Sequence, residues 1–236
     1  MVLAGGFGTR VKHLLGDLPK PMAPVNGRPF LEWVVRYLAA QKIRRVILST
    51  GHRAEAVAGH FDSQPVKGVR LSCVPETEPL GTAGGFLNAI RGQTQEPAAW
   101  LVLNGDSLAV APLDGMFQSL DRPEVEGAIL GVRVPDASRF GTVLSDAGGN
   151  LTGFNEKKPG AGTINAGIYL FRPPALRRFP DKSPLSFEAD VFPALIAGRV
   201  RLKVCVTDAP FLDIGTPESL PQAGDFIRRN AKSFES

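Results

Sequence analysis

The sequence predicts an α/β fold, a Rossmann-like three-layer structure with a mixed, mostly parallel central sheet. Short apolar runs typical of buried strands alternate along the chain with longer amphipathic segments typical of helices. A glycine-rich turn follows the first apolar run at once, as at the ligand-binding edge of such sheets. At 236 residues, with no visible linker or internal repeat, we expect residues 1–236 to form a single domain.

Apolar runs mark the expected strands. The first, at residues 2–4, is short and leads straight into glycines. Two runs separated by Asp146-Ala-Gly-Gly149 predict a hairpin, because this linker is typical of a tight turn. In chain order, the expected strands cover residues 2–4, 45–50, 69–74, 100–104, 128–134, 141–145, 151–155, 164–171 and 202–207.

Helical periodicity marks the segments between these strands. The clearest helix has one apolar face, formed by Phe30, Leu31, Val34, Val35 and Leu38. In chain order, the expected helices cover residues 30–41, 53–61, 82–91, 187–197 and 218–230.

Composition narrows the class of protein. An apolar fraction of 43% is ordinary for a globular chain, and a net charge of +4 suits small anionic substrates. Basic residues form no cluster of the kind that binds nucleic acid, and no apolar run reaches the roughly 20 residues of a membrane span. Without a signal peptide, a cytoplasmic location is expected, with Cys73 and Cys205 as free thiols. The sequence leaves the oligomeric state open, and a homodimer is one option.

The segment Leu3-Ala-Gly-Gly-Phe-Gly-Thr-Arg10 is the first candidate binding site. Three glycines in four positions let the backbone approach a ligand closely and direct N–H groups at it. Arg10 would lie beside bound phosphates, and Lys20, between Pro19 and Pro21, is held in a stiff frame. A tight turn with surface charges would explain the same residues. The patterns of dinucleotide-binding and Walker A loops are not matched.

A second glycine-rich segment, Glu76-Thr-Glu-Pro-Leu-Gly-Thr-Ala-Gly-Gly85, precedes and opens the helix at 82–91. Thr82 is the expected N-cap, and a helix N-terminus with small residues suits an anion or the edge of a base. A capped helix preceded by acidic residues is the alternative. Gly81 and Thr82 stand at this helix start.

Two aspartates are candidate metal ligands. Asp106 ends Leu101-Val-Leu-Asn-Gly-Asp106, at the carboxyl end of an apolar strand, and Asp213 follows another apolar stretch. Mg²⁺ takes hard oxygen ligands and usually one or two protein carboxylates, with phosphate and water completing its shell. The two residues fit that need if the fold brings them together. Otherwise Asp106 is a turn residue and Asp213 a helix-entry residue.

Together these segments resemble the sugar-1-phosphate nucleotidyltransferases. The resemblance runs from Leu3 to about Pro217 and includes three further motifs, Phe154-Asn-Glu-Lys157, Ile164-Asn-Ala-Gly-Ile-Tyr169 and Asp213-Ile-Gly-Thr-Pro217. It assigns the nucleotide to Leu3, Ala4, Gly5, Gly6, Gly8, Thr9, Gly81, Thr82, Asn104 and Gly105. Of these, it places Gly81 and Thr82 beside the base, with Glu78 as a weaker candidate there. It assigns the sugar phosphate to Gly141, Glu156, Lys157, Asn165 and Gly167. It implies catalytic roles for Arg10, Lys20, Asp106, Lys157 and Asp213, with Mg²⁺ on Asp106 and Asp213.

The implied reaction is an in-line attack of a sugar-1-phosphate oxygen on the α-phosphate of a nucleoside triphosphate, with release of pyrophosphate. Within the family, the chain most resembles the D-glycero-α-D-manno-heptose 1-phosphate guanylyltransferases, which use GTP. Mannose-1-phosphate guanylyltransferase and MurNAc-1-phosphate uridylyltransferase are alternatives. A catalytically silent sensor of nucleotide sugars is an alternative of another class, and a nicotinamide-dependent oxidoreductase is disfavoured by the unmatched dinucleotide loop.

Overall fold

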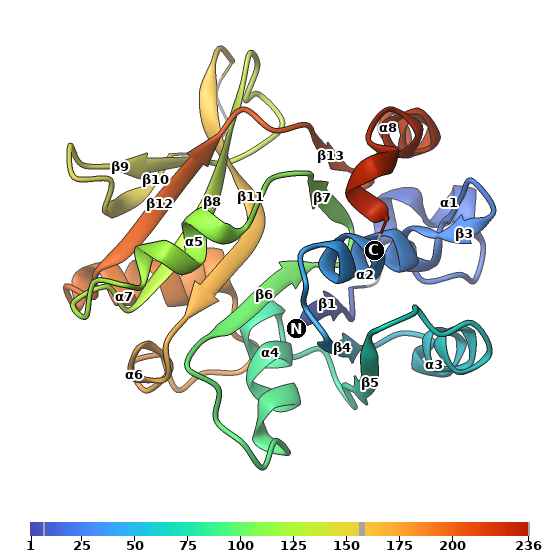
Figure 1. Ribbon diagram of the computed structural model, residues 1–236, viewed down its shortest axis with the longest axis horizontal. Coiled ribbons are helices and arrows are strands. Elements are labelled where there is room, and N and C mark those ends of the chain that lie inside the picture. Colours follow the sequence, from blue (N-terminus) through green and yellow to red (C-terminus); the bar gives the residue numbers. More distant parts are fainter. Residues whose placement is uncertain (7, 156–158, 236) are drawn as a thin grey trace.

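The computed structural model describes residues 1–6, 8–155 and 159–235 (Figure 1). Within these residues, nine strands form one mixed sheet. Its parallel half runs in the order β6 (Trp100–Asn104), β1 (Val2–Ala4), β4 (Arg45–Thr50) and β5 (Arg70–Pro75). Each matches an expected strand, and β1, β4 and β6 are mostly buried, as expected of apolar strands covered on both faces. The mixed, mostly parallel α/β sheet predicted from the sequence is confirmed.

The other half of the sheet is built on β11 (Gly162–Phe171), which runs antiparallel to β6. On its far side it pairs with β8 (Gly127–Val134), and β8 pairs in parallel with β12 (Leu202–Thr207). The predicted hairpin is formed by β9 (Thr142–Ser145) and β10 (Leu151–Asn155). This half lies to the left in Figure 1, and the parallel strands lie to the right.

The strand β11 changes partner along its length. Its Ile164 pairs with Thr142 of β9, whereas Ile168 to Phe171 pair with β6 on the same side. Between them the ladder is irregular, and Gly167 has a φ of +70°, a value that glycine adopts without strain. The irregularity opens a gap between β9 and β6 at the edge where the ligand-binding loops lie.

Helices cover both faces of the sheet. One face packs against α2 (Phe30–Ala40), α3 (Ala54–Ser63), α5 (Asp114–Ser119) and α8 (Ala223–Arg229). The other packs against α4 (Thr82–Arg91), α6 (Pro173–Leu176) and α7 (Phe192–Ala197), around a cluster of aromatic rings. The expected apolar face of α2 is fully buried. The shorter α1 (Lys12–Leu15) follows the glycine-rich loop, and a small ladder joins β2 (Pro24–Val25) to β3 (Arg28–Pro29).

Some elements differ from expectation. The segment 187–197 begins as a wide π-helical turn, Phe187–Val191, before α7, and the closing helix begins only at Ala223, after the 3₁₀ turn Leu220–Gln222. Prolines at positions 193 and 221 lie at these junctions, where an earlier regular helix would lose hydrogen bonds. Cys73 and Cys205 are free thiols, as expected. No helix in the described part of the chain has the length and apolarity to cross a bilayer.

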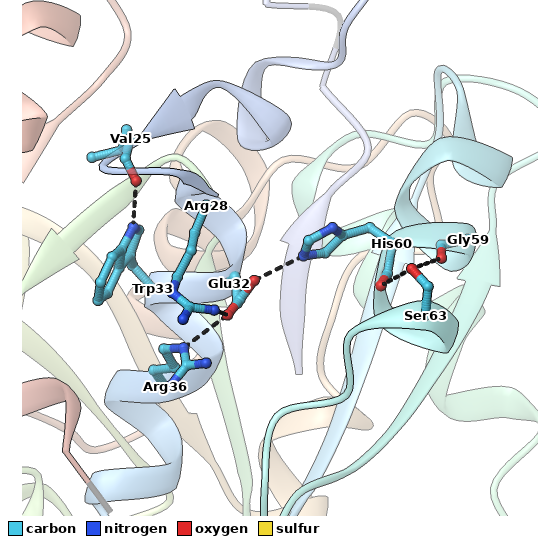
Figure 2. Close-up of polar contacts among 8 residues, drawn as sticks. All are labelled: Val25, Arg28, Glu32, Trp33, Arg36, Gly59, His60 and Ser63. Atoms are coloured by element: carbon cyan, nitrogen blue, oxygen red, sulfur yellow. Dashed lines mark hydrogen bonds and ion pairs between the residues drawn. The ribbon is translucent and has the colours of Figure 1, made fainter.

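A buried carboxylate joins α2 to α3 (Figure 2). Glu32 is 1% exposed and accepts hydrogen bonds from Arg28 (2.6 Å) and Arg36 (2.8 Å), and it pairs with His60 of α3 at 2.9 Å. Burial alone would raise the pKa of Glu32, but the hydrogen bonds from Arg36, His60 and Arg28 outweigh it and lower the pKa. Because a buried charge needs such partners, Glu32 fixes the position of α2 against α3.

Candidate functional site

Three adjoining cavities lie at the carboxyl ends of β1 and β6. Their volumes are about 260, 300 and 480 Å³, and they share lining residues: Leu3, Gly6 and Asp106 line the first two, and Asn104 lines the second and third. Leu3 and Asn104 are register partners in neighbouring strands, so the three cavities form one continuous site. This edge is where open α/β sheets bind their ligands.

The 260 Å³ cavity combines the glycine-rich loop with two cations. It is lined by Leu3, Gly6, Gly8, Arg10, Lys20, Pro21, Asp106 and Gly215. Gly8 has a φ of +57°, and a Cβ there would lie 2.6 Å from the Cβ of Lys20, so only glycine fits against the lysine. The cavity brings backbone N–H groups, a guanidinium and an ammonium to one place, which suits the phosphates of an anionic ligand.

The two predicted metal ligands are brought together by a short ladder that joins distant parts of the chain. In it, β13 (Phe211–Asp213) pairs with β7 (Ser107–Ala109), so Asp213 lies opposite Ser107, the residue after Asp106. The N–H of Ile214 donates to the carbonyl oxygen of Asp106 at 3.0 Å. Two acidic residues more than one hundred positions apart therefore become neighbours at the sheet edge.

Lys20 forms an ion pair with the first of these carboxylates. Its Nζ is 2.7 Å from Asp106 Oδ2, and its side chain is 12% exposed. A Cβ on Gly215 would lie 2.6 Å from Asp213 Oδ1 and 2.9 Å from Lys20 Nζ, so glycine is needed where the three groups meet. Burial and the negative charge of Asp106 raise the pKa of Asp213, and the charges of Lys20 and Arg139 partly offset this.

The donor set fits a magnesium ion. Two neighbouring carboxylates supply the hard oxygens that Mg²⁺ prefers, and the short ladder between β13 and β7 holds them at one edge of the sheet. Among the described residues, no group of three or more histidine, cysteine and acidic side chains is placed to hold a metal. A metal on Asp106 and Asp213 would thus rely on water and phosphate oxygens for its remaining ligands.

The 300 Å³ cavity contains an acidic residue that sequence reasoning missed. Glu76 accepts a hydrogen bond from Ser49 Oγ at 2.8 Å. It packs over two glycines, because a Cβ on Gly5 or on Gly85 would lie 2.5 Å from its Oε1. The expected Glu78 is exposed and does not line the cavity. Glu76 is the first residue of the second glycine-rich segment, but its acidic side chain alone did not distinguish it from Glu78.

Gly81 and Thr82 line the same cavity at the start of α4. The helix begins at Thr82 with Gly81, at a φ of +78°, in the N-cap position, so the expected capping role of Thr82 is wrong. The hydroxyl of Thr82 instead accepts a hydrogen bond from the N–H of Phe187 at 3.0 Å. A Cβ on Gly81 would lie 2.5 Å from the carbonyl oxygen of Leu185, so this glycine packs tightly under the cavity wall.

The 480 Å³ cavity fills the gap between β9 and β6. Asn165 Nδ2 donates to Tyr169 Oη (2.9 Å) and to Glu188 Oε1 (2.8 Å), and its Oδ1 accepts from the N–H of Gly167 (2.9 Å). Asn165 and Glu188, whose side chains can bond hydroxyl groups, therefore line the same cavity as Asp213. The lining residues are Asn104, Ser107, Arg139, Phe140, Gly141, Phe154, Asn155, Asn165, Ala166, Gly167, Glu188, Ala189, Phe211 and Asp213.

Most predicted site residues line the three cavities. They are Leu3, Gly5, Gly6, Gly8, Arg10, Lys20, Gly81, Thr82, Asn104, Asp106, Gly141, Asn165, Gly167 and Asp213. Ala4 is instead buried in the sheet, and Gly105 packs against the carbonyl oxygen of Leu3, so both support the site from behind. Thr9 opens a 3₁₀ turn after the loop. Glu156 and Lys157 lie outside the described residues.

Besides Glu76, sequence reasoning missed Arg139 and Glu188. Both are exposed side chains that line the largest cavity. Neither belongs to a motif singled out in the sequence, and an exposed charged residue has no periodic pattern that would distinguish it. Their place in the site comes from the way β11 brings separate loops together.

Comparison with known proteins gives one consistent result. A family model described as nucleotidyl transferase matches residues 1–230. D-glycero-alpha-D-manno-heptose 1-phosphate guanylyltransferase of Campylobacter jejuni is 34% identical over 92% of this chain and 95% of its own length. Mannose-1-phosphate guanylyltransferase of Mycobacterium tuberculosis is 36% identical over 98% of this chain, but the match spans only 63% of that relative.

A solved structure resembles the whole fold. The crystal structure of HddC from Yersinia pseudotuberculosis complexed with GMP-PN has a TM-score of 0.82 and 34% sequence identity. The similarity covers 95% of this chain and 96% of that one.

Proposed function

Because the chain belongs to the nucleotidyl transferase family, we propose that it is a guanylyltransferase acting on D-glycero-α-D-manno-heptose 1-phosphate. The products would be GDP-heptose and pyrophosphate. The observation that carries this proposal is the pair Asp106 and Asp213, with Lys20 bound to Asp106, where a glycine-rich loop adjoins a cavity large enough for a sugar. A protein that only sensed nucleotide sugars would not need two acidic groups beside its phosphate site.

The chemistry requires charge neutralisation rather than a general base. A sugar-phosphate oxygen is ionised at neutral pH and can attack the α-phosphate directly, so the barrier comes from bringing two anions together. Arg10 and Lys20 would hold the triphosphate, and Lys157 would hold the sugar phosphate. We propose Mg²⁺ on Asp106 and Asp213, where it would neutralise phosphate charge and align the two substrates. Positioning supplies the remaining rate enhancement.

The preference for GTP rests on Glu76. At neutral pH its carboxylate only accepts hydrogen bonds, and guanine offers two adjacent donors, N1–H and the N2 amino group. Uracil and thymine present one donor flanked by two carbonyl oxygens, which a carboxylate would repel. Glu76 lines the 300 Å³ cavity, where it packs over Gly5. A guanylyltransferase is therefore favoured over a uridylyltransferase.

The preference for a heptose over mannose rests on the comparisons. The heptose enzyme of Campylobacter jejuni matches along 95% of its own length, whereas the mannose enzyme of Mycobacterium tuberculosis matches along only 63%. In this proposal Asn165, Gly167, Gly141 and Glu156 contact the sugar, with Asn104 between sugar and nucleotide. Mannose 1-phosphate is the second candidate, favoured by the higher identity of that relative.

The test is a matrix of four nucleoside triphosphates against heptose, mannose, glucose and MurNAc 1-phosphates, with pyrophosphate release as the readout. The proposal predicts the highest kcat/KM for GTP with the heptose phosphate. A higher value for GTP with mannose 1-phosphate would support the second candidate. Absence of pyrophosphate with every pair would support the silent sensor, and a preference for UTP would contradict the role given to Glu76.

A further inference from the structure

Among the described residues that line the 480 Å³ cavity, Arg139 is the one cation. It lies in the loop between β8 and β9, and two carboxylates, Asp213 and Glu188, line the same cavity. A sugar 1-phosphate brings a phosphate with nearly two negative charges into these surroundings. Entry of that phosphate would be unfavourable unless a positive group in the cavity balances the carboxylates.

The guanidinium of Arg139 is oriented by contacts on two sides. Its Nη2 donates to Thr216 Oγ1 at 3.1 Å, and its Cζ lies 5.5 Å from the centroid of the Phe140 ring. Thr216 is itself fixed, because its Oγ1 is 3.1 Å from the hydroxyl of Ser219, a residue that is 3% exposed. The arginine is thus held in place although its side chain is exposed.

The same contacts tie Arg139 to the segment that carries Asp213. Thr216 lies three residues after Asp213. Phe140 packs edge-on against Phe211, the first residue of β13, with ring centroids 5.5 Å apart. The guanidinium therefore contacts the turn after Asp213 directly, through Thr216, and contacts β13 indirectly, through the ring of Phe140.

The hydrogen-bonding capacity of Arg139 is largely unused. A guanidinium has five N–H donors in a planar fork that matches two phosphate oxygens. Within the described residues, Thr216 Oγ1 is the one acceptor recorded for it. Arg133, six residues earlier in the chain, provides a contrast, because it pairs with Asp208 at 2.8 Å and does not line the cavity.

We propose that Arg139 binds the phosphate of the sugar 1-phosphate with its free N–H groups, while Thr216 holds it on the turn that carries Asp213. The proposal rests on the proposed function, because it names a second cation for the same substrate beside Lys157. It also explains why the arginine is attached to β13: arrival of the sugar phosphate and placement of Asp213 would involve the same rigid segment.

The test compares three variants, Arg139→Ala, Arg139→Lys and Thr216→Val, with Arg133→Ala as the matched control. For Arg139→Ala we expect the KM for the sugar phosphate to rise about 10-fold to 100-fold, as for loss of a charge-assisted hydrogen bond, while the KM for GTP stays within about twofold. Arg139→Lys should recover part of the loss, because lysine keeps the charge without the fork. Thr216→Val should shift the same KM by less, and Arg133→Ala should leave both unchanged.

Two results would overturn this role. One is an equal rise in both KM values, and the other is a loss of thermal stability with an unchanged KM for the sugar phosphate, as for a structural arginine.

Direct titration of heptose and mannose 1-phosphates, with a non-hydrolysable GTP analogue at saturation, separates this proposal from the proposed function. If the wild-type protein releases no pyrophosphate yet binds a sugar phosphate more tightly than Arg139→Ala does, only the catalytic assignment fails. If the wild-type protein and Arg139→Ala bind the sugar phosphates equally well, or if neither binds them, the proposed role of Arg139 is rejected.

Discussion

The ammonium of Lys20 lies 2.7 Å from the carboxylate of Asp106, and both residues line the 260 Å³ cavity. Burial and the charge of Asp106 raise the pKa of the nearby Asp213, so the lysine only partly balances the two acidic groups. The arrangement concentrates charge of both signs in a small volume, which costs stability and is a common property of sites built for function.

Replacement of Asp213, one of the two neighbouring aspartates, should lower activity without lowering stability. Asp213→Asn should reduce turnover at least about 100-fold, because a ligand for the proposed metal is lost. The unfolding temperature should stay level or rise, since the variant no longer buries a charge beside Asp106. Pyrophosphate release and thermal unfolding measure the two effects. Asp208→Asn is the control, because that exposed aspartate pairs with Arg133 away from the site. A near-normal rate for Asp213→Asn would remove this residue from the mechanism.

Asp106→Asn tests the other member of the pair. Turnover should again fall by orders of magnitude with the fold intact, because the amide neither replaces the carboxylate as a metal ligand nor balances Lys20. The same assay, run across a range of magnesium concentrations, measures the loss. Full activity of this variant at ordinary magnesium levels would show that the reaction does not depend on Asp106.

The role given to Glu76 predicts a change in base preference. Glu76→Gln replaces one of two acceptor oxygens by a donor, which cannot pair with both guanine donors. We expect the ratio of kcat/KM for GTP to that for UTP to fall about 10-fold or more. Ser49→Ala removes the hydroxyl that bonds Glu76 but keeps the carboxylate, and it should preserve most of the preference. An unchanged ratio in Glu76→Gln would place guanine recognition elsewhere.

The irregularity in β11 predicts that Gly167 cannot be replaced. An alanine there would have a positive φ, at a cost of about 1–2 kcal/mol, and its Cβ would lie 2.5 Å from Asn104 Nδ2. Gly167→Ala should therefore lower stability and raise the KM for the sugar phosphate. Gly59→Ala in α3 is the control, because no atom lies within 4 Å of its Cβ position, and this change should be neutral or stabilising. Equal unfolding free energies in the two variants would contradict the strain at Gly167.

The buried Glu32 predicts a dependence of stability on pH. Because its pKa is lowered in the folded state, the ionised group stabilises the fold at pH values above its ordinary pKa of 4.5, and this contribution disappears as the pH falls below that range. Glu32→Gln should lower the free energy of unfolding by about 2–4 kcal/mol at pH 7. Denaturant unfolding at pH 7 and near pH 4 should show a smaller difference at the lower pH. A difference that grows on acidification would contradict the ionised cluster.

The sequence predicted the parallel half of the sheet because its strands are local runs rich in apolar residues. It also located the glycine-rich loop at the sheet edge, where Gly5, Gly6, Gly8 and Arg10 line two of the three cavities. The resemblance of motifs indicated Asp106 and Asp213, but only the ladder between β7 and β13 explains how they meet. Both of these strands are three residues long, and no periodicity can be read from so short a run.

The 480 Å³ cavity could not be predicted from the sequence in the same way. It exists because β11 exchanges β9 for β6 along one edge, and pairing between distant strands leaves no local pattern. Arg139 reaches the cavity from the loop that precedes β9, and Glu188 from the π-helical turn that follows β11 and α6. Their types are common on any surface, so only their positions in space distinguish them.

The most direct measurement is phosphorus NMR of the protein mixed with GTP, D-glycero-α-D-manno-heptose 1-phosphate and Mg²⁺. Attack of the sugar phosphate on the α-phosphate predicts one pyrophosphate for each nucleotide sugar formed, and no consumption of GTP without the sugar phosphate. Release of inorganic phosphate and GDP, or consumption of GTP without any sugar phosphate, would contradict the account.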